Sequence, residues 1–227
     1  MNILTMAPTS RAITETNQYH VDTQRHHYFY QKGERIPLML ESIWQICEGL
    51  VRLSTLYPVG EECVLGWAGP SMCFSSYFSN LQTYQASALS SVSLMCYTML
   101  EVETRPKLAQ ELFPQLGKLF KQTEALLAIA GLRRVEDRLH QLLLLLKEEF
   151  GQPVPNGTRL NIRLTHQDIA AVIGTTRVTI TRLLGKFKQQ EWLSTDKSNF
   201  LILKKEIFPN SSDLFRFDSN TNINYQN

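Results

Sequence analysis

One segment, residues 165–190, constrains the fold of this chain more than any other. It reads THQDIAAVIGTTRVTITRLLGKFKQQ. Thr165 can cap a helix, with Asp168 at the reciprocal position of a capping box, and Gly174 permits a sharp turn after that helix. Either threonine of the pair that follows Gly174 can cap a second helix. The segment therefore predicts two short helices joined by a tight turn.

Apolar residues in this segment are spaced so that the two helices can support each other. Ala170 is small, as a close crossing of two helices requires. The expected inward residues are Ile169, Ala170, Ile173, Ile180, Leu183, Leu184 and Phe187. This pattern predicts a helix-turn-helix, whose second helix has a polar outer face.

The outer face of the second helix has the chemistry of DNA recognition. An α-helix fits the major groove, and side chains in its first turns reach base edges, while hydroxyl groups and lysines reach phosphates. Arg177 and Arg182 can each grip guanine, or contact phosphates without reading bases, and Val178 can touch a thymine methyl. The predicted DNA-binding residues are Thr165, Thr176, Arg177, Val178, Thr179, Thr181, Arg182, Lys186 and Lys197.

Charge is divided unevenly along the chain. Residues 157–205 carry nine Lys and Arg against three Asp and Glu, a net charge of +6, whereas the whole chain carries +2, so the remainder carries −4. A basic segment attached to an acidic body favours a polyanion-binding module on a separate support. Chance clustering on a solvated surface is the alternative.

Residues 20–104 have the pattern of a β domain. Short apolar runs are separated by turn signals such as Lys32-Gly33 and Gly69-Pro70. Turns that recur every 9–16 residues or so are typical of a sandwich or barrel of short strands. We therefore expect an antiparallel β jelly roll here.

A long helix is predicted over residues 105–132, followed by a second at Val135–Phe150. Positions spaced 3-4-3-4-3-4 form a heptad seam, at Ala109, Leu112, Leu116, Leu119, Thr123, Leu126 and Ala130. Such a seam lets two helices supercoil about each other. We interpret 105–132 as a dimerisation helix, with packing on its own domain as the alternative.

The complete fold class expected is α+β, with a β jelly roll, a long dimerisation helix and a winged helix-turn-helix. A short strand is expected at Arg159–Arg163, ahead of the helix-turn-helix, and a hairpin around Asp196–Asn199 would supply the wing. The expected domains are a loose arm 1–19, a jelly roll 20–104, the helix 105–132, a DNA-binding domain 133–208 and a disordered tail 209–227.

Several classes of protein are excluded by pattern. The longest apolar stretch, Leu142–Leu146, is far shorter than the roughly 20 residues of a spanning helix. The first residues show no basic leader followed by a long apolar block, so we expect no secretory signal, and we expect four cysteines to form no disulfide scaffold. We expect a cytoplasmic protein with reduced thiols and no contact with a membrane.

This layout resembles the Crp/Fnr family of transcription regulators. The run IGTTRVTITRLLG is similar to the recognition region of the family's cyanobacterial nitrogen-control (NtcA) branch, and Arg177, Val178 and Arg182 match its base-reading positions. The resemblance implies a homodimer that reads a palindromic site in double-stranded DNA with half-sites related to GTA…TAC. It also implies a cyclic-nucleotide-binding-like sensor domain and RNA polymerase as a partner.

The sensor region departs from the family's patterns. From Leu53 through Thr104 there is no Lys, Arg or His, so the phosphate-holding arginine of the cyclic-nucleotide sensors is missing. Glu124 resembles a residue of the family's 2-oxoglutarate site, but the arginine expected one turn earlier is Leu119. We expect no cofactor and neither of these two effectors.

Control by a partner protein or by thiol redox chemistry is the alternative mode of regulation. Cys73 is the candidate thiol because it follows Gly69-Pro70 in a predicted loop. An enzyme is disfavoured, since the β region offers only His20, His26 and His27, and neighbours on a strand point to opposite faces.

Overall fold

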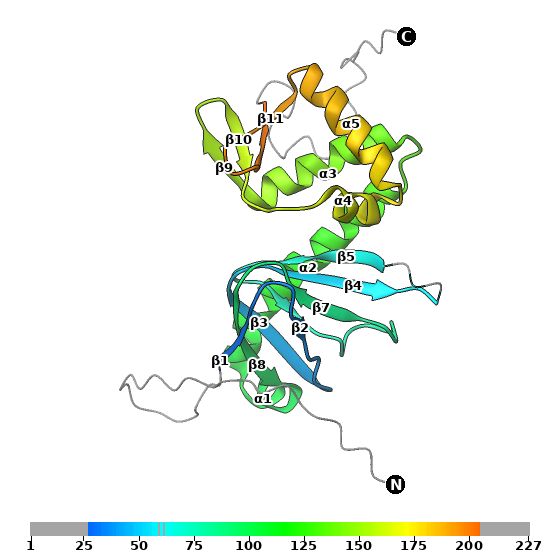
Figure 1. The fold of residues 1–227 in the computed structure, drawn as a ribbon. Helices are drawn as coiled ribbons and strands as arrows, with labels where there is room; N and C mark the ends of the chain where they lie inside the picture. The colour runs from blue at the N-terminus through cyan, green and yellow to red at the C-terminus, as the bar shows by residue number, and fades with distance from the viewer. Residues whose placement is uncertain (1–26, 59, 61, 205–227) are drawn as a thin grey trace. The chain divides into compact units, whose positions relative to one another are not determined.

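The computed structural model describes residues 27–58, 60 and 62–204 of the chain. The predicted arm 1–19 and tail 209–227 lie outside this range. The chain divides into two units, Met1–Thr123 and Glu124–Asn227, whose boundary falls inside the long helix α2, Pro106–Ala130 (Figure 1). The domain limits expected from the sequence remain predictions.

The first unit is an antiparallel β sandwich, which confirms the jelly-roll-like expectation. Its two sheets have the strand orders β1-β8-β3-β6 and β2-β7-β4-β5. The strands are β1 His27–Tyr30, β2 Arg35–Ile36, β3 Ser42–Glu48, β4 Val51–Leu56, β5 Glu62–Ala68, β6 Cys73–Phe74, β7 Gln85–Ala88 and β8 Val92–Thr98.

Alternation of side chains along the strands builds the core between the sheets. Trp44 and Ile46 of β3 point inward and pack with Leu53 of β4 and Leu94 of β8, because successive residues on a strand face opposite sides. Ile43, on the outer face of β3, belongs instead to a second buried cluster.

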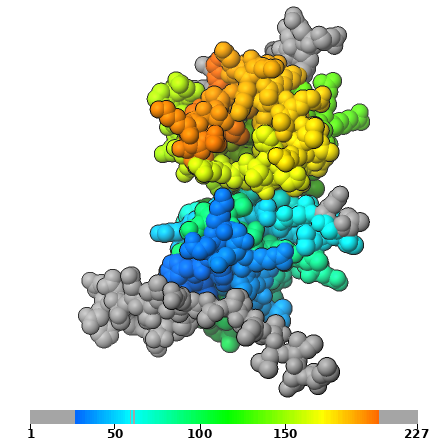
Figure 2. Space-filling view, viewed as in Figure 1, coloured from blue at the N-terminus to red at the C-terminus, as the bar shows by residue number. Residues whose placement is uncertain are grey.

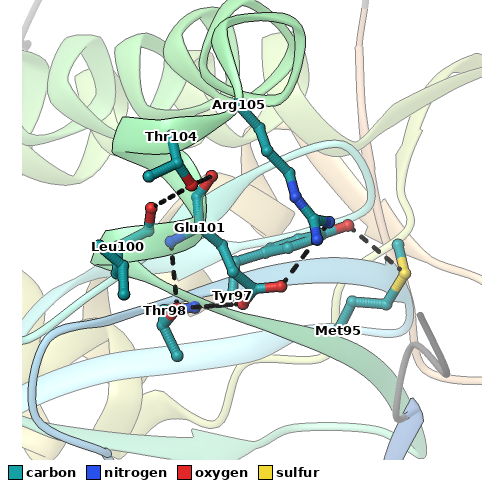
Figure 3. Close-up of polar contacts among 7 residues, drawn as sticks. All are labelled: Met95, Tyr97, Thr98, Leu100, Glu101, Thr104 and Arg105. Carbon is teal, nitrogen blue, oxygen red and sulfur yellow. Dashed lines mark hydrogen bonds and ion pairs between the residues drawn. The ribbon is translucent and has the colours of Figure 1, made fainter. Parts of the chain in front are cut away.

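That second cluster lies under the helices α1, Met99–Thr104, and α2. Thr98 begins α1 with a capping box, in which its Oγ1 accepts from the Glu101 N–H at 3.2 Å and a Glu101 carboxylate oxygen accepts from the Thr98 N–H at 2.9 Å. Figure 3 shows this cap, with Arg105 reaching back to the Glu101 carboxylate. The cap sets the direction in which the chain enters α2.

The position of α2 corrects part of the predicted dimer seam. Leu112 is 1 % exposed and lies in the cluster beneath the helices, while Leu116 packs on the same cluster and Leu119 packs on the sandwich core. These three residues face the β layer of their own subunit. A heptad seam and a one-sided helical stripe share the same spacing over a few turns, so the sequence did not distinguish them.

A different stripe of large apolar residues on α2 is exposed. Phe113 is 77 % exposed, Phe120 65 % and Leu127 75 %. They follow one another at intervals of seven residues, which places them on one side of the helix. Of the original seam, Thr123 and Ala130 are also exposed.

Polar side chains fix the inner face of α2 to the sandwich. The Gln122 side chain, 1 % exposed, pairs with the backbone of Trp67 in β5: its Oε1 accepts from the Trp67 N–H at 2.7 Å and its Nε2 donates to the Trp67 carbonyl at 3.0 Å. A Cβ at Gly66 would overlap Gln122 Oε1. The glycine therefore gives the glutamine room to approach the strand.

The second unit carries a four-stranded sheet of order β11-β12-β10-β9 and three helices of its own. Helix α3, Val135–Phe150, has the predicted bounds. The remaining elements are β9 Gly151–Val154, β10 Gly157–Leu160, α4 His166–Ile173, α5 Arg177–Gln189, β11 Leu193–Thr195 and β12 Leu201–Leu203.

Two details of this unit differ from the sequence expectation. The strand predicted at Arg159–Arg163 lies at Gly157–Leu160, and it pairs with β9, a strand that contains Pro153 and was not expected from the sequence. An edge strand tolerates proline because one of its sides has no ladder bond to lose.

No helix in the described part of the chain has the length and apolar content needed to cross a membrane.

We predict that Gln122→Ala lowers the free energy of unfolding by about 2–4 kcal/mol, because it leaves a buried N–H and a buried carbonyl of Trp67 unpaired. Gln110→Ala, the same change at an exposed position of α2, should alter stability by less than about 0.5 kcal/mol. Urea unfolding of both variants measures the difference. Equal effects of the two substitutions would contradict the role given to Gln122.

Candidate nucleic-acid interface

The capping residues of α4 and α5 lie where the sequence predicted them. Thr165 Oγ1 accepts from the Asp168 N–H at 3.1 Å, and a carboxylate oxygen of Asp168 accepts from the Thr165 N–H at 2.8 Å. Thr176, one of the two candidates for the second cap, accepts from the Thr179 N–H at 3.2 Å. Each cap fixes the backbone at the start of its helix.

Gly174 makes the turn between these helices. Its φ of 63° and ψ of 58° lie in the left-handed region, and its N–H donates to the carbonyl of Ala170. A glycine adopts this conformation without the steric penalty of a Cβ. All the predicted inward residues of the two helices are buried: Ile169, Ala170, Ile173, Ile180, Leu183, Leu184 and Phe187. The predicted helix-turn-helix is confirmed.

The first turns of α5 present an exposed face. Val178 is 78 % exposed, and Thr176, Arg177, Thr181 and Arg182 are exposed as well. In Figure 2 the amber side chains of α5 lie at the surface of the second unit. An exposed valine beside two arginines suits a groove that offers both thymine methyl groups and guanine acceptors.

Two residues predicted to contact phosphates are engaged within the protein. The Thr181 hydroxyl donates to the Arg177 carbonyl at 3.0 Å and lies 2.8 Å from Nδ1 of His166. Lys186 Nζ lies 2.9 Å from a Glu136 carboxylate oxygen of α3. These contacts connect α5 with α4 and α3, and the predicted contacts of Thr181 and Lys186 with DNA stay predictions.

The wing is a short hairpin stabilised by an aspartate. Asp196 Oδ1 accepts from the N–H groups of Ser198 and Phe200 at 2.8 and 2.9 Å. Lys197 is exposed at its tip. The hairpin joins β11 to β12, as the sequence predicted.

Two arginines outside the predicted site support this hairpin. The guanidinium carbons of Arg159 and Arg163 lie 4.2 and 4.6 Å from the ring centre of Phe200. Arg159 Nε also lies 3.2 Å from the Asp196 carboxylate, and Arg163 donates to the Ser198 carbonyl at 2.9 Å. The sequence shows the charge of these two arginines but not their stacking on Phe200. Local sequence patterns extend over a turn or a heptad, whereas Phe200 lies much further along the chain.

The structure contradicts the proposed redox role of Cys73. This residue lies in β6 rather than in a loop, and its side chain is fully buried. Burial, assisted by the neighbouring Cys47, raises the pKa of the Cys73 thiol to about 12. A reactive thiol needs an accessible thiolate, whereas Cys73 donates to Oε1 of Gln115 at 3.3 Å.

The other candidate effector residue is Glu124, which is exposed on α2. Among the residues described, no group of three or more His, Cys, Asp or Glu side chains is placed to hold a metal ion.

A β sandwich, a long helix and a winged helix-turn-helix with an exposed arginine face define the class of DNA-binding regulators with an N-terminal β domain. The Crp-like helix-turn-helix domain matches residues 137–206. The regulatory protein CysR of Synechococcus elongatus is 40 % identical over 157 residues, which cover 68 % of this chain and 72 % of that protein. The chain belongs to the Crp/Fnr family of DNA-binding transcription regulators.

Two further similarities agree with that assignment. The global nitrogen regulator of Synechocystis sp. is 32 % identical over 171 residues, covering 71 % of this chain and 76 % of that protein. A Crp/Fnr-family transcriptional regulator of Thermus thermophilus has the same fold, with a TM-score of 0.64, 21 % identity and coverage of 80 % of this chain and 97 % of that chain. These relatives are regulators and not enzymes.

We predict opposite effects for two glycine-to-alanine substitutions in this region. Gly174→Ala should destabilise the unit by about 1–2 kcal/mol because its backbone is left-handed. Gly185→Ala should stabilise it by up to about 1 kcal/mol, since Gly185 lies inside α5 with nothing within 4 Å of an added Cβ. Urea unfolding of the two variants gives the signs, and a stabilising Gly174→Ala would show that the turn has another conformation.

Proposed function

We propose that the chain acts as a homodimer in the cytoplasm and reads a palindromic DNA site through α5. The observation that carries this proposal is that Arg177, Val178 and Arg182 are exposed together on α5, the second helix of the helix-turn-helix. The half-sites are of the GTA…TAC type. Thr165, Thr176, Thr179 and Lys197 complete the proposed contacts with DNA.

The proposed division of labour follows from side-chain chemistry. Arg177 and Arg182 each offer paired donors that match O6 and N7 of guanine, and Val178 offers an apolar surface to a thymine methyl. Thr165 and Lys197 lie at the start of α4 and at the wing tip, where they suit phosphates. Phosphate contacts set the position of the protein on DNA, and base contacts set its specificity.

Dimerisation is proposed through the exposed stripe of α2, Phe113, Phe120 and Leu127, with Thr123 and Ala130 beside it. Large apolar side chains repeated every seven residues form the core of a parallel two-helix pair. In a two-fold symmetric dimer, the two copies of α5 would suit successive major grooves, about 34 Å apart. A palindromic site is the DNA counterpart of this symmetry.

We further propose that no small anion is needed to hold α2 on the sandwich. Gln122 supplies two hydrogen bonds to β5 from within the chain, and residues 53–104 contain no Lys, Arg or His that could pair with a buried anion. An anion without a cationic partner is costly to desolvate.

RNA polymerase is the proposed partner for transcription.

Control by another regulatory protein is the second candidate. Tyr77, Phe78 and Leu81 are exposed on the loop between β6 and β7, and the rings of Tyr77 and Phe78 contact each other edge to face at 5.3 Å between centroids. Exposed aromatic side chains are enriched in protein interfaces. This observation favours a partner over a small ligand.

We predict that Arg177→Ala lowers affinity for a duplex with the GTA…TAC palindrome by about 1–3 kcal/mol and relaxes preference at one base pair of each half-site. Lys197→Ala, the control for a phosphate contact, should weaken all duplexes alike and reduce the salt slope by about one per subunit. Fluorescence anisotropy with the palindrome and single-base variants separates the two. Unchanged discrimination in Arg177→Ala would refute the base-reading role.

We predict that Phe120→Asp converts the dimer to a monomer, because it places a carboxylate in the core of the helix pair. Lys121→Asp is the matched control, since the adjacent residue points about 100° away around the helix and should leave the dimer intact. Sedimentation equilibrium gives the mass of each variant. A dimeric Phe120→Asp protein would place the two-fold contact elsewhere.

A further inference from the structure

His166 connects the two helices of the helix-turn-helix. It is the first residue of α4, and its Nδ1 lies 2.8 Å from Oγ1 of Thr181 in α5. The Thr181 hydroxyl carries one proton, and it donates that proton to the Arg177 carbonyl at 3.0 Å. When the hydroxyl keeps that bond, it has no proton left for the ring, so Nδ1 of His166 donates to Thr181 and the neutral ring is the Nδ1–H tautomer.

This tautomer leaves Nε2 as the ring nitrogen available to a ligand. Among the described residues, the hydrogen bond of the ring is the one made by Nδ1. The half-buried ring follows Thr165, which is exposed and belongs to the proposed phosphate contacts. In the neutral ring Nε2 is an acceptor, so it cannot donate to a phosphate oxygen unless it first gains a proton.

The surroundings of the ring keep it neutral in the free protein. Burial lowers the pKa of His166 below its ordinary value, and the positive charges of Arg177 and Lys188 in α5 lower that pKa further. On α4 itself, Asp168 is the nearest carboxylate in sequence, and it is engaged by Thr165 in the capping box. Helix α3 also packs on α4, and its Glu136 is paired with Lys186 of α5.

We propose that His166 is a phosphate-binding residue whose Nε2 takes up a proton when the DNA backbone approaches. The proton comes from solvent, forms the Nε2–H bond and is then donated to a phosphate oxygen, while Nδ1 keeps its contact with Thr181. This inference rests on the proposed DNA recognition by α5. It adds to that function a dependence on pH.

The sign of this dependence follows from linkage. A phosphate beside Nε2 raises the pKa of His166 in the complex, whereas burial and the charges of Arg177 and Lys188 hold that pKa below its ordinary value in the free protein. The complex then binds more protons than the free protein, so affinity rises as pH falls between the two pKa values. The limit is about tenfold per pH unit for each half-site.

The test measures affinity of the full chain for the palindromic duplex from about pH 8 to pH 5.5, the range in which histidine titrates, at constant ionic strength. Wild type should bind more tightly as pH falls. His166→Gln should retain discrimination between the palindrome and a scrambled duplex at pH 8 but lose the slope. His27→Gln, a change of the same type on exposed β1, should keep the slope.

Other outcomes overturn the proposal in distinguishable ways. A wild-type protein that discriminates the palindrome with a flat pH profile would overturn the role of His166 and leave the proposed function standing, as would a slope that persists in His166→Gln. Failure to discriminate any palindrome would overturn both. Long-range ¹H–¹⁵N spectra should show the Nδ1–H tautomer in the free protein and a doubly protonated ring in the complex at the same pH.

Discussion

Helix α2 has two apolar faces, and the rest of the structure depends on how they are separated. The inner face carries Leu112 and Gln122 against the β sandwich, and the outer face leaves Phe113, Phe120 and Leu127 exposed. Burying side chains of this size contributes roughly 1.5–3 kcal/mol each, so both faces favour contact. The two hydrogen bonds of Gln122 are directional. They fix the rotation of α2 about its axis and thereby decide which residues remain for a second copy.

The contact between α2 and β5 supports the proposal that no small anion is needed to hold α2 on the sandwich. Gln122 bonds to both backbone groups of Trp67, much as a neighbouring strand would. The cost of an unpaired buried amide makes this contact all-or-none. Moving α2 away from β5 would therefore require breaking both hydrogen bonds of Gln122.

The helix-turn-helix and the antiparallel β domain were predictable from sequence, whereas the facing of α2 and the burial of Cys73 were not. The caps at Thr165 and Thr176 and the left-handed Gly174 depend on neighbours within a few residues, and the printed sequence contains them all. The facing of Leu112 depends on which strand lies opposite, which no local pattern encodes. Cys73 was predicted in a loop for the same reason. Its two-residue strand β6 is defined by pairing with the distant strand β3, and after a Gly-Pro turn so short a strand resembles a loop.

Recognition helices must be held rigidly while keeping their outer donors available. In α5 the hydroxyl of Thr181 bonds inward to the backbone of Arg177, and Lys186 bonds to Glu136. These contacts hold the helix against α4 and α3, and they leave the guanidinium groups of the first turns as the outward donors. His166 belongs to both sets, because Nδ1 braces Thr181 while Nε2 is available to a ligand. In this proposal, His166 both supports α5 and binds phosphate. The affinity for DNA then depends on pH without any movement of the helices.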